Sequence, residues 1–345
     1  MLVYKIDQAK LLPSSLHMEF SMISTYLGID VSKENFDCIL LYQTGNNYHK
    51  SCSNNTKGFH NLVDWLRKKK IETSQIHICM ESTGIYSLPL AEFLFERNFY
   101  TSVVNPLKIK FFGTSMLMRT KTDRADAKLI ARYCEKMSPA RWEPKPENVK
   151  KLRELVARLN SLKEMHRQEA NRLETINVSE VRDSVKKYVR SFQKEMIKIE
   201  DKIKILIDSD IDLKKKVELL SSIPGVSNKT SWEFLSHICA DDFEKGRQVS
   251  AFIGLNPRQR QSGSSVNGNT RLSKIGVKEL RSSLYMPAVC AATHNPVLKR
   301  FYERLLLKGK KKMVALGAVM RKLTHIMFSV LKKERMFFDP AAEIV

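Results

Sequence analysis

The chain has 345 residues, with 59 Lys and Arg against 37 Asp and Glu, which gives a formal charge of +22 at pH 7. Its length predicts two or three domains, and an apolar content of 43% excludes a disordered basic tail. So large a charge excess indicates a polyanionic partner, either nucleic acid or an anionic membrane surface, and makes a small neutral substrate a poor match.

The cysteines and the first residues bear on where the protein acts. Six cysteines stand singly, with no C-x-x-C pair, which argues against a zinc ribbon or a secreted disulfide scaffold and favours a reducing compartment. Lys5, Asp7, Lys10 and Pro13 interrupt the apolar segment that a signal peptide would need. No uninterrupted apolar run approaches the ~18 residues of a membrane span. We therefore expect a cytoplasmic protein that acts at the nucleoid and has no membrane partner.

The first half of the chain has an α/β pattern. Residues 1–22 resemble nothing that follows and contain Met18 and Met22, so we expect either a disordered extension or a start codon placed too far upstream. Residues 23–145 are predicted to form one domain, with strands at 26–31, 36–42, 48–53, 75–82 and 100–104 and helices at 56–69, 85–97 and 123–136. Thr56 is the expected cap of the first helix, and a polar turn at Ser32–Asn35 joins the first two strands. This order predicts a mixed sheet covered by helices.

The second half is predicted to be mainly helical. After the proline-rich boundary near residue 145, apolar residues spaced by three and four predict two long helices over 148–210, as a coiled-coil hairpin or a dimer stalk. Residues 211–345 are expected to form a C-terminal domain with flexible loops, one of them at 261–269. Ile223-Pro224-Gly225 lies in a stretch that resembles a helix-hairpin-helix, which would contact a DNA phosphate, although a plain interhelical turn is an equal alternative.

Four carboxylates stand where a ligand crevice forms in an α/β sheet. Asp30 ends the first strand, two residues after Gly28, and Glu81 ends the strand at 75–82. Asp123 and Asp126 are three residues apart on a helix and share one face. Each alone is typical of a turn or a helix cap, but the set in a basic chain favours a catalytic role. Converging carboxylates need cations, and Mg²⁺ is the natural match; two such ions would clamp a phosphate.

The Ser/Gly-rich loop near residue 262 is a second candidate for a functional site. Arginines beside such a loop would hold a phosphodiester, and a serine hydroxyl there would be placed to attack phosphorus. The loop contains no His, so a serine-hydrolase relay is not indicated, and its composition is also that of an ordinary loop. The run Lys308–Met313 is either a further backbone contact or a solvated face. We expect nucleic-acid contacts from basic residues near the two motifs: Lys33, Arg124, Arg258, Arg260, Arg271 and Lys274.

These pieces, in this order, resemble the bridge-RNA-guided insertion-sequence transposases, which join an N-terminal RuvC-like DEDD domain to a C-terminal serine domain. The motifs that carry the resemblance are Gly28-Ile-Asp-Val-Ser-Lys33, Glu81-Ser-Thr-Gly84, Val104-Asn-Pro106, Lys121-Thr-Asp-Arg-Ala-Asp-Ala127, Ile223-Pro-Gly225, Gly254-Leu-Asn-Pro-Arg258, Gln261-Ser-Gly-Ser-Ser-Val266 and Arg271-Leu-Ser-Lys-Ile-Gly276. They run from about residue 26 into the C-terminal region, and the extension 1–22 is the one clear departure.

The resemblance implies a fold, a site and partners. It implies an RNase H-like (RuvC-like) α/β domain, long coiled-coil helices and a mainly α C-terminal domain. It assigns Asp30, Glu81, Asp123 and Asp126 as metal ligands for Mg²⁺, and Ser262 as a nucleophile that links transiently to DNA. It further implies a structured guide RNA that pairs with donor and target DNA, and a dimer or tetramer whose composite sites combine the two domains from different subunits.

Three hypotheses follow for the function. The leading one is an RNA-guided transposase or recombinase that uses metal-assisted serine attack, strand exchange and religation. The alternative is a RuvC-like, metal-dependent endonuclease that resolves branched DNA with water as the nucleophile. The third is a nucleic-acid-binding protein whose acidic site has lapsed, which the presence of all four carboxylates argues against. Tyr285 and Tyr302 are weaker candidates for the nucleophile.

Overall fold

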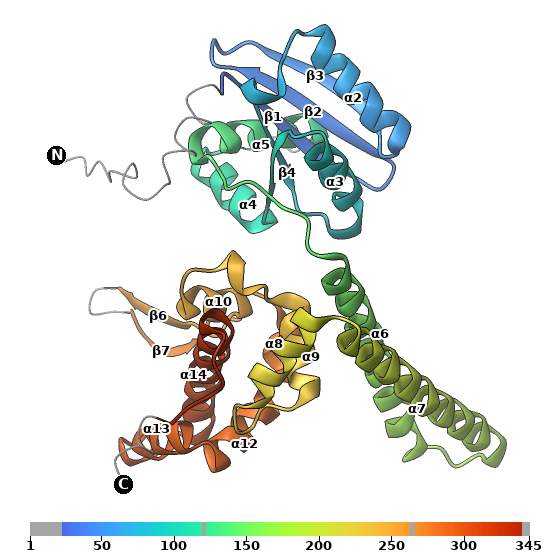
Figure 1. Ribbon diagram of the computed structural model, residues 1–345, viewed down its shortest axis with the longest axis vertical. Coiled ribbons are helices and arrows are strands. Elements are labelled where there is room, and N and C mark those ends of the chain that lie inside the picture. Colours follow the sequence, from blue (N-terminus) through green and yellow to red (C-terminus); the bar gives the residue numbers. More distant parts are fainter. Residues whose placement is uncertain (1–22, 119–121, 263–265, 340–345) are drawn as a thin grey trace. The chain divides into compact units, whose positions relative to one another are not determined.

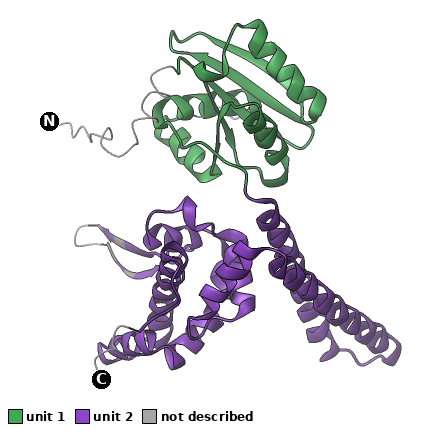
Figure 2. Ribbon diagram, in the orientation of Figure 1, with its two compact units in different colours: residues 1–144 green, residues 145–345 purple. Residues whose placement is uncertain are grey.

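The computed structural model describes residues 23–118, 122–262 and 266–339 (Figure 1). The expected extension at 1–22 lies outside these described residues. The chain divides into two compact units, residues 1–144 and 145–345 (Figure 2), and each unit is described by itself.

The described part of the first unit contains a five-stranded sheet of order β3-β2-β1-β4-β5. Its strands are β1 (Thr25–Val31), β2 (Asn35–Tyr42), β3 (Asn47–Ser53), β4 (Ile76–Glu81) and β5 (Tyr100–Val104). β1, β2 and β3 pair antiparallel as successive hairpins, whereas β4 pairs parallel with β1, and β5 parallel with β4. The mixed sheet predicted from the sequence is therefore confirmed.

Different helices cover the two faces of this sheet. Successive residues of a strand point to opposite faces, so Leu27 and Ile29 of β1 pack in one core with α2 (Thr56–Lys68) and α3 (Leu88–Glu96). On the other face, Ile39 and Leu41 of β2 pack with Ala127 and Ala131 of α5. The helix α5 spans Asp123–Met137, and α4 (Pro106–Ser115) lies beside it. Asp30 follows the alternation onto the α5 face.

Two local predictions in this unit differ from the structure. The cap of α2 is Asn55 and not Thr56, because the Asn55 side chain accepts a hydrogen bond from the Gly58 N–H at 3.0 Å. The helix α4 was not predicted at all. Its start is capped by Asn105, which accepts from the Leu107 N–H at 2.8 Å, and Pro106 occupies the first turn. The Asn-Pro pair that ends β5 is thus also a helix start.

The second unit begins with a long helical hairpin. α6 (Glu147–Leu173) and α7 (Ser179–Asp208) pack along each other, and both bury apolar residues in the core of this unit. The other described helices complete that core: α8 (Ile211–Ser221), α9 (Asn228–His237), α10 (Gly246–Ile253), α11 (Lys278–Ser283), α12 (Tyr285–His294), α13 (Pro296–Leu307) and α14 (Lys312–Lys333). This unit is mainly helical, as the sequence predicted.

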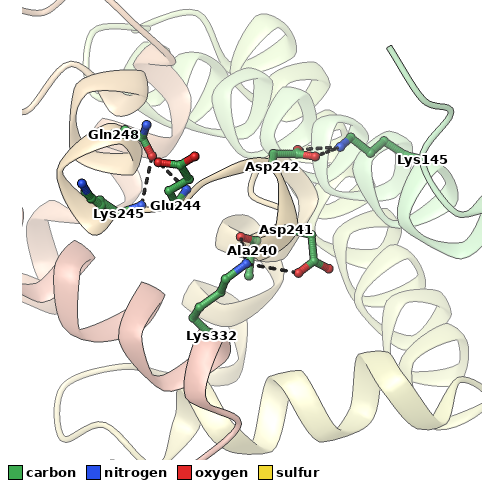
Figure 3. A network of polar contacts seen from close by, with 8 residues as sticks. All are labelled: Lys145, Ala240, Asp241, Asp242, Glu244, Lys245, Gln248 and Lys332. Carbon is green, nitrogen blue, oxygen red and sulfur yellow. Dashed lines mark hydrogen bonds and ion pairs between the residues drawn. The ribbon is translucent and has the colours of Figure 1, made fainter. Parts of the chain in front are cut away.

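Polar contacts hold the start of the second unit in place. Lys145 forms an ion pair with Asp242 of the short 3-10 helix η4 (Ala240–Asp242), and Lys332 of α14 binds the same short helix at the Ala240 carbonyl, 3.4 Å away (Figure 3). Three residues earlier, Trp142 belongs to the first unit, where its N–H donates to the Thr101 carbonyl at 2.7 Å. The boundary therefore falls at Glu143 and Pro144.

Judged by length and composition only, the helix α14 could cross a membrane. No other helix among the described residues is long and apolar enough to do so. The sequence analysis counted uninterrupted apolar runs, which Arg321 and Lys322 break. In the structure 56% of its most apolar window is buried, and it packs against α8, α10, α12 and α13. These contacts are those of a core helix.

Part of the segment 261–269, which the sequence predicted to be a loop, forms strands: residues 261–262 and 266–269 are paired, and 263–265 lie outside the described residues. β6 (Pro257–Ser262) and β7 (Val266–Leu272) pair antiparallel as a two-stranded sheet, with an irregularity between Arg258 and Arg260. Ser262 and Gly268, two of the residues that indicated a loop, lie in paired strands, so strand pairing overrides the local composition there.

Candidate active site

Two of the predicted site residues lie side by side at the end of the sheet. β1 and β4 are parallel neighbours, with Gly28 opposite Cys79 and Ile29 opposite Met80. The next residues along, Asp30 and Glu81, therefore stand next to each other at the carboxyl ends of adjacent strands, on the same face.

Gly28 brings the other two carboxylates to the same place. A Cβ atom at Gly28 would lie 2.1 Å from the Ala127 carbonyl oxygen and 2.2 Å from the Ala131 nitrogen, so only glycine lets α5 approach β1 this closely. Asp123 and Asp126 lie in the first turn of α5, which Thr122 caps by accepting from the Ala125 N–H at 3.2 Å. The close packing places this turn beside the end of β1.

The electrostatics of Asp30 reflect this gathering of charge. Burial, followed by the negative charges of Asp126, Glu81 and Asp123, raises the pKa of Asp30 from its usual 3.8 to about 6. Repulsion of this kind requires carboxylates in the same neighbourhood. The structure thus places Glu81, Asp123 and Asp126 near enough to Asp30 for their charges to act on it.

A fifth carboxylate belongs to this neighbourhood and was missed by the sequence analysis. Asp37 lies directly opposite Asp30 in the antiparallel pairing of β1 and β2, and it also contributes to the raised pKa of Asp30. His49 of β3 contacts it, with 2.6 Å between His49 Nε2 and Asp37 Oδ1. The signal was present in the sequence: a turn at Ser32–Asn35 sets the strand register and places residues 30 and 37 in one pair.

The donor set suits a hard divalent cation, because carboxylate oxygens are the ligands that Mg²⁺ and Ca²⁺ prefer. The side chains nevertheless stand apart: among the described residues, no three or more His, Cys, Asp or Glu side chains are grouped closely enough to hold one metal ion. The register and the repulsion on Asp30 concern the backbone and the local charge, whereas the grouping depends on side-chain rotamers. The strand register and the packing of α5 therefore place the four carboxylates at one end of the sheet, whereas their side chains are not grouped around a single point.

The second predicted motif lies in the other unit. The backbone of Ser262 ends β6 and pairs with Val266, and its side chain is outside the described part of the structure. Arg258 and Arg271 stand directly opposite each other on the hairpin, and both are exposed. Two like charges in a cross-strand pair are unfavourable in a free protein, so this pair favours an anionic partner.

The base of the hairpin is fixed by a network that the sequence analysis did not identify. Ser250 of α10 donates to the Asn256 side chain at 3.1 Å, and His325 of α14 contacts the Ser250 hydroxyl at 3.1 Å. The Asn256 carbonyl accepts from the Ser273 N–H at 2.8 Å, which closes the open end of the two strands. The strand that carries Ser262 therefore starts from a rigid point on two helices.

The other predicted basic residues are at the surface. Lys33 lies in the turn between β1 and β2, Arg124 in the first turn of α5, and Lys274 just after β7, and all three are exposed. Arg260 lies on β6, with its side chain outside the described part. The structure divides these residues between the two units.

The Pro224-Gly225 segment forms a tight turn between α8 and α9. Gly225 has a positive φ of 100°, and a Cβ there would lie 2.8 Å from Ala291 of α12. Ser227 caps α9 by accepting from the Thr230 N–H at 3.3 Å. Two helices joined by a tight turn fit both the helix-hairpin-helix and the plain interhelical turn that the sequence left open.

The first unit, with a mixed sheet whose central strand ends in an acidic residue and whose covering helix adds two more, has the RNase H-like fold of RuvC-type nucleases, the class predicted from the sequence. Residues 27–176 match the transposase family of the IS110 DEDD type, and residues 217–303 match the transposase family IS116/IS110/IS902. The chain belongs to the IS110 family of transposases and is a DNA-processing enzyme.

Relatives support this membership along nearly the whole chain. The pilin gene-inverting proteins of Moraxella bovis and Moraxella lacunata are each 34% identical over 319 residues, which cover 92% of this chain and 98% of theirs. An insertion element IS110 protein from Streptomyces coelicolor is 24% identical over 115 residues, 33% of this chain and 28% of its own. Among solved structures, T. thermophilus RuvC in complex with a Holliday junction aligns with a TM-score of 0.26 and 11% identity, over 34% of this chain and 98% of RuvC.

Proposed function

We propose that this transposase is an RNA-guided DNA recombinase that breaks DNA by serine attack at an Mg²⁺-dependent site and rejoins it after strand exchange. The observation that carries the proposal is the placement of Asp30, Glu81, Asp123 and Asp126 at one end of the sheet, where burial and then the charges of the other three raise the pKa of Asp30. Such a cluster is costly to folding and is explained by a ligand that neutralises it.

The four carboxylates would hold the divalent cation, which would supply charge stabilisation at the scissile phosphate. Asp30 and Glu81 would do so from the strand ends, and Asp123 and Asp126 from the first turn of α5. The close packing at Gly28 would keep the two pairs in a fixed relation. Asp37, which His49 contacts, would stand next to Asp30 at the edge of the site.

Ser262 would be the nucleophile. Its Oγ would form a bond to phosphorus while one P–O bond of the DNA backbone breaks, and the hydroxyl proton would pass to the departing oxygen, which leaves as a free hydroxyl end. The hydroxyl end of the exchanged strand would then attack the phosphoserine and release the serine unchanged. The number of phosphodiesters is conserved, so no energy source is needed. Arg258 and Arg271 would hold the strand on the hairpin.

The proposal also includes the partners of the chain. It would bind a guide RNA together with donor and target DNA, and it would act as a dimer or tetramer. The net charge of +22 supports contact with several nucleic-acid backbones, and base pairing by an RNA would relieve the protein of reading sequence. The Moraxella relatives are named for gene inversion, which requires both breakage and rejoining of DNA. We place the activity in the cytoplasm, at the nucleoid.

The test is to trap the covalent intermediate. A suicide DNA substrate releases the hydroxyl end that would otherwise attack the phosphoserine, so the covalent complex accumulates. It should give protein-linked DNA with the wild-type chain and Mg²⁺, and none with Ser262→Ala. Ser264→Ala and Ser265→Ala are the matched controls from the same segment. Protein-linked DNA from Ser262→Ala would remove Ser262 as the nucleophile.

The alternative is a RuvC-like endonuclease that uses water. The same carboxylate cluster supports it, because that cluster does not depend on Ser262. It predicts cleavage of branched DNA with no covalent complex, abolished by Asp30→Asn and largely intact in Ser262→Ala. Sequencing of RNA that copurifies with the protein would test the guide separately.

A further inference from the structure

The turn between α13 and α14 carries four exposed lysines that have no acidic partner among the described residues: Lys308, Lys310, Lys311 and Lys312. The first turn of α14 also contains no acidic residue. Lysines at the start of a helix add positive charge where carboxylates are favoured, so this arrangement is electrostatically unfavourable in the free protein. It favours an anionic partner in the same way as the arginine pair on the hairpin.

Exposed apolar side chains surround these lysines. Leu307, at the end of α13, is 89% exposed, and Met313 and Val314, at the start of α14, are exposed as well. From the start of α12, the Tyr285 hydroxyl donates to the Met313 sulfur at 3.8 Å, and the neighbouring Met286 is exposed. Contact between Tyr285 and Met313 joins the two apolar groups into one surface, here called the α13–α14 patch.

Lysines beside an aromatic ring and flexible apolar side chains limit the kinds of anionic partner that could cover the whole patch. A regular duplex offers phosphates but keeps its bases stacked inside, so it would leave the apolar side chains uncovered. A strand with unstacked bases offers both: phosphates for the lysines, and base faces for Tyr285 and the apolar side chains. An anionic membrane would also match lysines beside apolar residues. The membership of the chain in a transposase family favours nucleic acid.

We propose that the α13–α14 patch binds a DNA strand whose bases are unstacked, such as a strand displaced from a duplex. The lysines bind its phosphates, and Tyr285, Met286, Leu307, Met313 and Val314 contact its bases. This goes beyond the proposed reaction, since the patch contains none of the residues assigned to bond breakage.

The experiment measures equilibrium binding of the full-length chain to a labelled 20-nucleotide single strand in EDTA, over a series of salt concentrations. Replacing Lys308, Lys310, Lys311 and Lys312 with Ala should weaken binding and reduce the slope of log Kd against log salt by up to about 2.8, at about 0.7 per contact with a single strand. The control removes the same charge from exposed lysines of α7, at Lys186, Lys187, Lys194 and Lys198, and should leave most of that slope in place.

A second pair of variants tests the apolar half of the patch. Tyr285→Ser should weaken binding by at least about fivefold without changing the salt slope, whereas Tyr285→Phe, which keeps the ring, should bind like the wild type. A single DNA strand, the occupant that the transposase family favours, should bind more tightly than the duplex of the same sequence, and tighter binding of a single RNA strand would overturn the assignment to DNA.

The proposal is overturned if the lysine variant keeps the wild-type slope, or if the α7 control loses as much. It is also overturned if the patch variants bind oligonucleotides normally but lose binding to vesicles of phosphatidylcholine and phosphatidylserine, because the patch is then a membrane contact. Binding in EDTA involves neither Ser262 nor a bound cation. A normal patch variant with Asp30-dependent DNA cleavage would therefore reject this inference and leave the proposed function intact.

Discussion

Asp30 and Asp37 face each other directly across the antiparallel strands β1 and β2, on the side of the sheet that α5 covers. Like charges in such a pair are destabilising, and here three further carboxylates gather around Asp30. The like charges at this end of the sheet therefore lower the stability of the fold.

Replacing Asp30 with Asn should stabilise the metal-free protein while abolishing DNA cleavage. Because the pKa of Asp30 is raised to about 6 in the folded state, the folded chain holds a proton more tightly than the unfolded chain. The wild-type protein therefore loses stability as the pH rises from about 4 to about 6, and the loss persists above that range.

Thermal melts in EDTA at pH 5 and pH 8 measure this effect. Asp30→Asn should be more stable than the wild type at pH 8, on the order of 1 kcal/mol after allowance for solvent screening, with a smaller difference at pH 5. Asp64→Asn, on the exposed face of α2, should show neither effect. An Asp30→Asn protein less stable than the wild type at pH 8 would contradict the assigned repulsion.

Magnesium should raise the melting temperature of the wild-type chain and not that of Asp30→Asn or Glu81→Gln. A ligand that binds only the folded state stabilises it in proportion to the logarithm of its concentration. Protons compete for Asp30, so the magnesium needed for half of the maximal shift should be greater at pH 5.5 than at pH 7.5. Equal shifts in the wild type and both variants would place the cation elsewhere.

Gly28→Ala should be strongly destabilising, by roughly 3 kcal/mol or more, because the new methyl group would collide with the backbone of α5. Any folded fraction should have lost DNA cleavage, since α5 carries Asp123 and Asp126. Gly45→Ala is the control: its φ is 88°, but nothing lies within 4 Å of the added atom, so about 1 kcal/mol of backbone strain is expected. Denaturant titration of both variants makes the comparison.

Arg258→Gln should leave stability unchanged or raise it by up to about 0.5 kcal/mol, because it removes a like-charge pair with Arg271. The same variant should bind duplex DNA less tightly, with a salt slope lower by about 0.9 if it loses one phosphate contact. Higher stability together with weaker DNA binding would show that Arg258 contacts DNA and does not hold the hairpin together. A variant that is less stable and binds DNA normally would show the reverse.

Strand alternation and helix spacing were enough to predict the mixed sheet and the α5 helix from sequence. They located Asp30 and Glu81 at strand ends and Asp123 and Asp126 on one turn, because short-range periodicity determines those positions. Asp37 was missed because its importance lies in a cross-strand register that was not worked out. The β6–β7 hairpin was missed because its glycines and serines are typical of loops, and the pairing that overrides them is a contact between segments. Whether Ser262 meets the acids depends on assembly, and it stays a prediction.

The gathering of acidic residues around Asp30 would have a consequence for the life of the protein in a cell. A chain that lacked the proposed cation would be the less stable form, and it would open more often to proteases than the loaded form. The supply of divalent ions would then govern how many copies survive as well as how fast each one works, and the same cluster would limit the activity of a mobile element in a starved host.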